Sequence, residues 1–419
     1  TAKYYFEHSI KINSKNILTH FNLGNLNLEV GKEKEAEFFF LKCINLQKNY
    51  FPAIVNLSKI YLKNYDLDKC IKLLSNSLNH FPNNAIILEN LAKVYLIKKK
   101  LHLAEKFLIK LIQLSKENIK KIIPLILGYS YEGNEKQYKK ICKLYIQNLT
   151  KDSSIFSLNQ KKKKLPIISF LSPDIRNHPV GFFIKDMLPE LSKRFKVIIF
   201  STSEFEDEIS LYSKKFCQWI NLKVKNDHEI ADIIYRKKVD VLIDSSGLTR
   251  TNNLGVFKLR PSKNQISWAG WLASTNLKEM DYVISDNFCT RKKDESSFTE
   301  KILRMKNIWC TYSLSVLENL NLNKENNPEP FIIYGCFQRP EKISKNVLST
   351  WIDILIRVKK SKIFFINQFF NEYERKKLIS HFGNKGVSSK RLIFIQPKNR
   401  TQYLNSYNLV DINLDTFPY

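Results

Sequence analysis

The chain has 419 residues, 43% of them hydrophobic and 12% aromatic, and a formal net charge of +28. Its length predicts roughly two to four domains, and its composition excludes a disordered or fibrous protein because it can fill sizeable cores. The lysines are spread over nearly every segment, so we expect a solvated basic surface and no specific nucleic-acid site, while an anionic small ligand stays compatible with the charge.

The first part of the chain repeats itself every 34 residues. The blocks 17–50, 51–84 and 85–118 align with large and small residues in shared columns: Leu23, Leu57 and Leu91; Gly24, Ser58 and Ala92; Ala2, Ala36, Cys70 and Ala104; Phe6, Phe40, Leu74 and Leu108. Small residues where two helices cross, and large ones in the groove between blocks, are typical of the tetratricopeptide repeat. We therefore predict an α-solenoid over 1–149, in which 119–149 cap or adapt the repeats.

Residues 150–164 are polar and unpatterned, which predicts a linker. After it, short β-rich runs alternate with amphipathic runs of helical length, among them 207–220. This alternation indicates parallel sheets covered by helices on both faces. The polar stretch LNKENNPEP separates two such series, so we predict two Rossmann-like domains, over 165–327 and 328–419, with a cleft between them.

The cysteines, the apolar runs and the two ends of the chain indicate where the protein works and whether the sequence is whole. The seven cysteines show no paired spacing, and we interpret them as reduced, mostly buried residues of a cytoplasmic protein. No apolar run reaches the roughly 18 to 20 residues that cross a bilayer, and no signal peptide is visible. The chain starts without Met and stops at DTFPY, so we expect that both ends are cut.

Two strand-to-helix turns carry candidate site residues, because ligands bind at such turns in open α/β sheets. His178 lies in SPDIRNHPVGFF, after the apolar run LPIISFL. His178 could take part in catalysis, or it could serve only to form hydrogen bonds with the backbone of the turn. Lys342 and Gln338 lie in FQRPEKIS, after FIIYGCF. A lysine charge and free backbone N–H groups there can hold phosphate oxygens, although a solvated lysine is the alternative.

Five ordered blocks of the sequence resemble those of the O-linked N-acetylglucosamine transferase and Spindly family, glycosyltransferase family forty-one: SPDIRNHPVGFF, LIDSSGLTRTNNLGVFKLRPSKNQISWAGW, MDYVISD, FQRPEKIS and LDTFPY. The resemblance implies tetratricopeptide repeats followed by two facing Rossmann-like domains of the GT-B type, the second incomplete in this chain. It also implies inverting, metal-independent transfer of a sugar to Ser or Thr hydroxyls of proteins. We expect no cofactor, UDP-N-acetylglucosamine as co-substrate, and acceptor polypeptides along the repeat groove.

The resemblance also assigns roles to single residues. His178 matches the histidine that lies beside the reaction centre of the family, as a base or as a positioning donor. Lys342 matches the lysine that contacts the diphosphate, and Gln338 shares its turn. Arg400 is a looser candidate for the donor side, with a surface arginine as the alternative. Trp268 and Trp271 we assign to core packing and not to sugar stacking; no metal site is predicted.

The chain departs from the family pattern in places that keep other functions open. Leu248 stands where the family has a histidine, and residues 271–276 read WLASTN where the family reads roughly Tyr-Pro-Gly-Thr-Ser-Gly. The family continues after LDTFPY with a stretch that grips the nucleotide, whereas this chain stops at Tyr419. One alternative is the same fold with another donor or acceptor, such as GDP-fucose or asparagine. The other is a repeat scaffold whose transferase half no longer catalyses.

Overall fold

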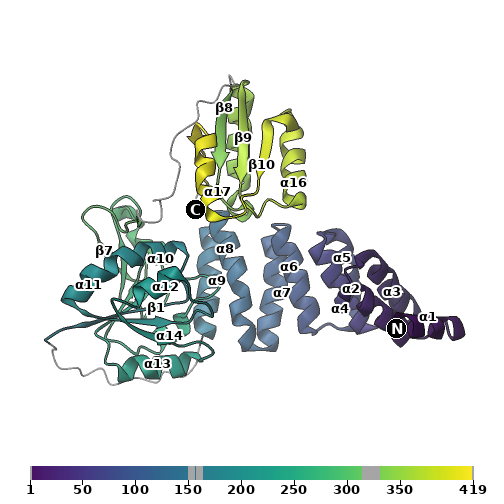
Figure 1. The fold of residues 1–419 in the computed structure, drawn as a ribbon, viewed down its shortest axis with the longest axis horizontal. Helices are drawn as coiled ribbons and strands as arrows, with labels where there is room; N and C mark the ends of the chain where they lie inside the picture. Colours follow the sequence, from purple (N-terminus) through teal and green to yellow (C-terminus); the bar gives the residue numbers. More distant parts are fainter. Residues whose placement is uncertain (1, 150–155, 157–163, 314–330, 418–419) are drawn as a thin grey trace. The chain divides into compact units, whose positions relative to one another are not determined.

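The computed structural model describes residues 2–149, 156, 164–313 and 331–417 (Figure 1). Most of the predicted linker and all of LNKENNPEP lie outside these residues. The chain divides into two compact units, Thr1–Glu132 with Glu372–Lys377 and Gly133–Asn371 with Leu378–Tyr419.

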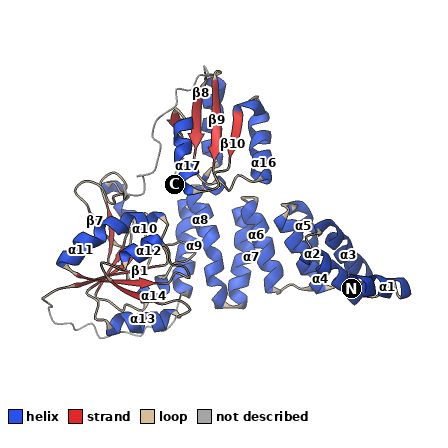
Figure 2. Cartoon of the chain, viewed as in Figure 1, coloured by secondary structure: helices blue, strands red, loops and turns tan. Residues whose placement is uncertain are grey.

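The first unit is a succession of paired helices (Figure 2). In chain order these are α1 (Ala2–Ile12), α2 (Ile17–Glu29), α3 (Glu33–Leu46), α4 (Phe51–Lys63), α5 (Leu67–His80), α6 (Ala85–Ile97), α7 (Leu101–Leu114), η1 (Lys116–Ile122) and α8 (Ile123–Tyr131). The small residues of the repeat lie at close helix crossings, as predicted. A Cβ on Gly24, for example, would come within 2.5 Å of the Phe40 ring.

The turn inside each helix pair repeats with the sequence. Gly31, Tyr65 and Lys99 lie 34 positions apart, and each has a positive φ, of 76°, 57° and 53°. Gly133 continues the series with a φ of 69° and joins α8 to α9 (Glu135–Asn148). A left-handed residue is a usual way to end a helix. The left-handed turn of the repeat therefore recurs after α8.

The second unit begins with α9 and contains two parallel sheets. The first sheet has the strand order β3-β2-β1-β4-β5-β6-β7. Its strands are β1 (Ile167–Ser172), β2 (Lys196–Ser201), β3 (Gln218–Asn221), β4 (Val241–Asp244), β5 (Asn264–Ser267), β6 (Tyr282–Ser285) and β7 (Lys301–Arg304). In Figure 1, α10 (Pro179–Ile184), α11 (Leu188–Arg194) and α12 (Glu208–Ser213) cover one face, and α13 (Asp227–Arg236) and α14 (Leu254–Lys258) the other.

The second sheet has the order β10-β9-β8-β11. Its elements are β8 (Ile332–Cys336), η5 (Pro340–Lys342), α15 (Lys345–Arg357), β9 (Ser361–Ile366), α16 (Glu372–Gly383), β10 (Leu392–Ile395), α17 (Arg400–Asn405), η7 (Ser406–Leu409) and β11 (Ile412–Asn413). Its core gathers large side chains, among them Trp351, Phe365 and Phe382. The predicted fold class, an α-solenoid followed by α/β domains, is confirmed.

One local prediction was wrong, and one strand was missed. The helix predicted over 207–220 ends at Ser213, and Gln218–Asn221 form strand β3, which pairs with β2. The strand β7 was not predicted, because only its alternate residues are half-buried at the edge of the sheet. Short amphipathic runs fit a helix and a strand equally well, so neighbouring strands decide between them. No described helix is both long and apolar enough to cross a membrane.

Candidate active site

In both parallel sheets the strand order reverses at the first strand. In the first sheet, β2 and β3 extend to one side of β1, and β4 to β7 extend to the other. In the second, β9 and β10 lie on one side of β8, and β11 on the other. Loops that leave the carboxyl ends of the two strands at such a reversal diverge, and ligands bind in the space between them. The predicted residues His178, Gln338 and Lys342 all follow the central strands β1 and β8.

His178 begins helix α10 as its N-cap. Its backbone is extended, with φ −150° and ψ 152°, and Nδ1 accepts a hydrogen bond from the N–H of Val180 at 3.3 Å. Nδ1 can accept only when it carries no proton, so the neutral ring carries its proton on Nε2. The ring therefore satisfies the helix start and presents a donor at its other nitrogen.

The surroundings of His178 favour the neutral ring. Burial lowers the pKa of His178 below 6.5, and the guanidiniums of Arg176 and Arg339 lower it further. The carboxylate of Asp174 opposes this shift. Arg339 belongs to the turn after β8, so this turn and His178 lie close enough to interact.

The turn after β4 faces the same reversal point as His178. Asp244 is fully buried and accepts from the N–H groups of Ser246 (3.0 Å) and Gly247 (2.9 Å). Burial raises the pKa of Asp244 to about 6. Gly247 has a φ of +54°, and a Cβ there would lie 2.1 Å from the Cβ of Trp271. Only glycine fits this position, because both its conformation and the contact exclude a side chain.

In the second sheet, the turns after β8 and β11 are joined by a hydrogen bond. Nε2 of Gln338 donates to Oδ1 of Asp415 at 2.9 Å. Burial lowers the pKa of Lys342, and Arg339 adds to this effect, while Asp415 and Glu341 oppose it. Lys342 and Arg339 thus bring two positive charges to the reversal point. A partly desolvated cation pair of this kind can bind an anion such as a diphosphate.

Arg400, the looser candidate for the donor side, contacts helix α10 and Tyr312. Its guanidinium is 4.2 Å from the centroid of the Phe182 ring and hydrogen-bonds to the hydroxyl of Tyr312. Phe182 belongs to α10, the helix that His178 caps. The contacts of Arg400 are therefore with α10 and with Tyr312, while Gln338, Arg339 and Lys342 share the turn after β8.

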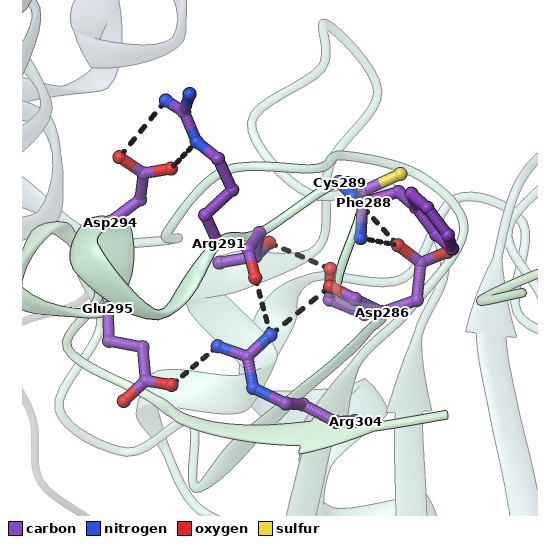
Figure 3. A network of polar contacts seen from close by, with 9 residues as sticks. Asp286, Phe288, Cys289, Arg291, Asp294, Glu295 and Arg304 are labelled. Atoms are coloured by element: carbon purple, nitrogen blue, oxygen red, sulfur yellow. Dashed lines mark hydrogen bonds and ion pairs between the residues drawn. The ribbon is translucent and has the colours of Figure 1, made fainter. Parts of the chain in front are cut away.

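A polar network holds the segment beside α10 in place (Figure 3). The carboxylate of Asp286 accepts from the N–H groups of Phe288 (2.8 Å), Cys289 (2.7 Å) and Trp309 (3.0 Å). Arg304 donates to the carbonyl of Asp286 at 3.2 Å. Trp309 then packs edge-on against Phe183 of α10, and its carbonyl accepts from Nε1 of Trp268 at 2.9 Å.

Helix α9 is docked on the first sheet through its tyrosines. The hydroxyl of Tyr145 donates to Oδ1 of Asn252 at 2.9 Å, and that of Tyr138 accepts from Nε1 of Trp271 at 3.3 Å. Nζ of Lys258 donates to two carbonyls at the end of α9. Trp268 and Trp271 are 6% and 3% exposed, which agrees with the core role predicted for both.

Sequence reasoning missed Asp244 and Asp415. Asp244 binds the backbone of its own turn, whereas Asp415 meets Gln338 only through the fold. Sequence reasoning also missed a signal that the sequence carries: Asn22, Asn56 and Asn90 recur one position before the leucine column of the repeat. Nδ2 of Asn56 donates to Asn25 at 2.8 Å. Groups of three or more possible metal ligands do not occur among the described residues.

Comparison with known proteins finds a family match for the part of the chain that holds His178. Residues 123–314 match Glycosyl transferase family 41, and residues 18–50 match the tetratricopeptide repeat. The probable UDP-N-acetylglucosamine–peptide N-acetylglucosaminyltransferase SPINDLY of Oryza sativa subsp. japonica is 28% identical over 69% of this chain and 32% of its own length. The corresponding SEC protein of Arabidopsis thaliana is 23% identical over 59% of this chain and 26% of its own. The chain thus spans about a third of such relatives.

A solved structure supports the same assignment at the level of the fold. An O-GlcNAc transferase variant from Thermobaculum terrenum superposes with a TM-score of 0.72 over 96% of this chain and 78% of that one, at 20% identity. The GT-B arrangement predicted from the sequence is thereby confirmed. Together with the matched blocks, this confirms the resemblance to glycosyl transferase family 41, whose model matches residues 123–314, behind a tetratricopeptide match over 18–50.

Proposed function

We propose that the protein transfers a sugar, in the first place N-acetylglucosamine, from a UDP donor to Ser or Thr hydroxyls of polypeptides. The transfer would be a single inverting displacement without a metal ion. The observation that carries this proposal is the position of the family-matched residues. His178 and the pair Gln338 and Lys342 follow the central strands of two parallel sheets, where such folds bind ligands.

On the donor side, we propose that Lys342 and Arg339 hold the diphosphate. In the displacement, the acceptor oxygen bonds to the anomeric carbon while the bond from that carbon to the diphosphate breaks. Negative charge grows on the departing diphosphate, so fixed cations stabilise the transition state more than the ground state. Gln338 is held by its hydrogen bond to Asp415, and the remaining donor and acceptor sites of its amide can orient the nucleotide.

On the acceptor side, we propose that His178 positions and does not abstract a proton. The hydrogen bond from Val180 to Nδ1 leaves Nε2 protonated in the neutral ring, and a protonated nitrogen donates. A general base would have to offer an unprotonated nitrogen to the acceptor hydroxyl. The lowered pKa keeps the ring neutral at pH 7 and so preserves this donor geometry.

The repeats are the proposed binding surface for the acceptor polypeptide. Stacked helix pairs form an extended concave surface that suits an extended chain. Of the asparagine column, the exposed Asn22 and the half-buried Asn56 support this role, because a side-chain amide both donates to and accepts from a peptide backbone. Asn90 is buried and donates to Ser58 instead.

One observation favours another donor or acceptor as the second candidate function. Leu248, at the position where the family has a histidine, is fully buried. It therefore offers no polar contact to a ligand at the turn after β4. The preference for donor or acceptor could differ from that of the relatives while the reaction stays the same.

A panel of nucleotide sugars tests the proposal on the full-length protein. A ligand at 100 times its Kd stabilises the folded state by about 2.7 kcal/mol, which raises the melting temperature. We expect this rise with UDP-N-acetylglucosamine, followed by a mass increase of acceptor peptides. A rise with GDP-fucose alone would favour the second candidate. Stabilisation by no nucleotide sugar would contradict the proposal and favour a scaffold.

A further inference from the structure

The segment after β5 is built around a buried carboxylate that no prediction used. Glu300 precedes β7 and is 5% exposed. It accepts from the hydroxyl of Ser274 at 2.7 Å, from the N–H of Thr275 at 2.7 Å and from the hydroxyl of Thr275. The hydroxyl of Thr299 is a further donor at 3.1 Å. Within the described part of the chain, no lysine or arginine forms an ion pair with this carboxylate.

The hydroxyls of Ser274 and Thr275 also bind backbone N–H groups of the same segment. An ionised carboxylate only accepts, so Ser274 and Thr275 turn their protons toward Glu300 and their lone pairs away from it. Oγ of Ser274 accepts from the N–H of Asn276 at 3.0 Å, and Oγ1 of Thr275 from that of Leu277 at 3.3 Å. Asn276 has a φ of 58°, in the left-handed region. Glu300 therefore helps to fix the path of the segment 271–277.

This segment has no room to move independently of the turn after β4. A Cβ on Gly270 would lie 2.4 Å from the carbonyl carbon of Ser245, and one on Gly247 would lie 2.1 Å from Trp271. The turn after β4 lies at the reversal point of the first sheet, opposite the turn that carries His178. A shift of the segment 271–277 must therefore displace the turn after β4, which borders the candidate site.

We propose that Glu300 is a positioning residue for the transfer reaction. It holds the segment 271–277, and through it the turn 245–247, in the geometry that the acceptor side of the site requires. The inference rests on the proposed function. A buried carboxylate that only neutral donors satisfy costs desolvation energy, which an apolar side chain in a purely structural role would avoid.

The test compares Glu300→Gln with Glu295→Gln in the full-length protein. The amide keeps the size of the side chain but turns one acceptor into a donor, which mismatches the Ser274 and Thr275 hydroxyls. Glu295 is the control, because it lies nearby and pairs with Arg304 on the surface (Figure 3). Hydrogen exchange is followed in peptides that span 244–250 and 268–280. The Kd for UDP-N-acetylglucosamine, and kcat and KM with an acceptor peptide, are measured beside it.

We expect Glu300→Gln to speed exchange in both segments and to lower kcat by about 10- to 100-fold, the loss that misplaced reacting groups cause. The donor Kd should stay that of the wild type, and Glu295→Gln should change none of these quantities. Exchange that speeds up only in 268–280, with kcat unchanged, would reduce Glu300 to a structural role and overturn the proposal.

The outcome separates this inference from the proposed function. If the wild type transfers no sugar, the proposed function fails, and exchange in 244–250 alone then decides whether Glu300 holds that turn. If Glu300→Gln does not fold, Glu300→Asp takes its place. Its shorter carboxylate still accepts but cannot reach every donor, and the same two segments are compared with the same control.

Discussion

Replacing Gly247 by alanine should be among the most damaging small changes in the first sheet. Its φ of +54° is unfavourable for a residue with a side chain, at a cost of about 1–2 kcal/mol. The added Cβ would lie 2.1 Å from Cβ and 3.0 Å from Cγ of Trp271, and overpacking of this kind costs about 1–3 kcal/mol. We therefore expect Gly247→Ala to lower the free energy of unfolding by roughly 2–5 kcal/mol.

Two other glycines separate these contributions. Gly386 also has a positive φ, of +84°, but nothing lies within 4 Å of its would-be Cβ, so Gly386→Ala should cost only the conformational part. Gly383 ends α16 with open space and no positive φ, so Gly383→Ala should be neutral or stabilise by up to about 1 kcal/mol. Denaturant unfolding followed by tryptophan fluorescence measures all three. A loss for Gly247→Ala no larger than that for Gly386→Ala would refute the close contact with Trp271.

The remaining predictions concern two titratable groups of the first sheet. His178→Ala should lower kcat by about 10²- to 10³-fold, as the loss of a positioned donor does, with the donor Kd unchanged. The wild-type rate should hold as pH falls to 6.5 and drop only below it, because protonation of Nδ1 breaks the bond from Val180; a pH–rate midpoint above 6.5 would contradict this. Asp244 has its folded pKa raised from 3.8 to about 6, so the folded state binds the proton more tightly and this group destabilises the fold as pH rises between those values. The contribution is roughly 3 kcal/mol, and urea unfolding at pH 4 to 7 should show that Asp244→Asn removes it; equal slopes for variant and wild type would disprove the assignment.

The sequence allowed the fold class to be predicted because its signals are periodic. A 34-residue register sets the helix pairs, and alternating strands and helices imply parallel sheets. It did not reveal β3, whose short run fits a helix equally well until β2 is present as a partner. Nor did it show that the left-handed turn of the repeats recurs at Gly133, between α8 and α9.

The candidate site could be predicted only where a residue stands next to its own strand. His178 and Lys342 are of this kind, because each follows a central strand directly. Asp415 meets Gln338 across 77 positions of the chain, and Glu300 meets Ser274 across 26. Such pairs depend on which strands become neighbours in the sheet, and local patterns carry no information on that. The stacking of Arg400 on Phe182 also joins residues far apart in the chain, so the sequence alone could not show it.

The central claim is that the turn after β8 holds a nucleotide sugar through Lys342. Calorimetric titration of UDP-N-acetylglucosamine into the full-length protein tests it most directly, with Lys342→Ala as the variant and the exposed Lys345→Ala as the control. Loss of a charge-assisted contact worth about 1.5–3 kcal/mol should weaken binding roughly 10- to 100-fold for the first variant and leave it unchanged for the second. Equal affinities for wild type and Lys342→Ala would contradict the account.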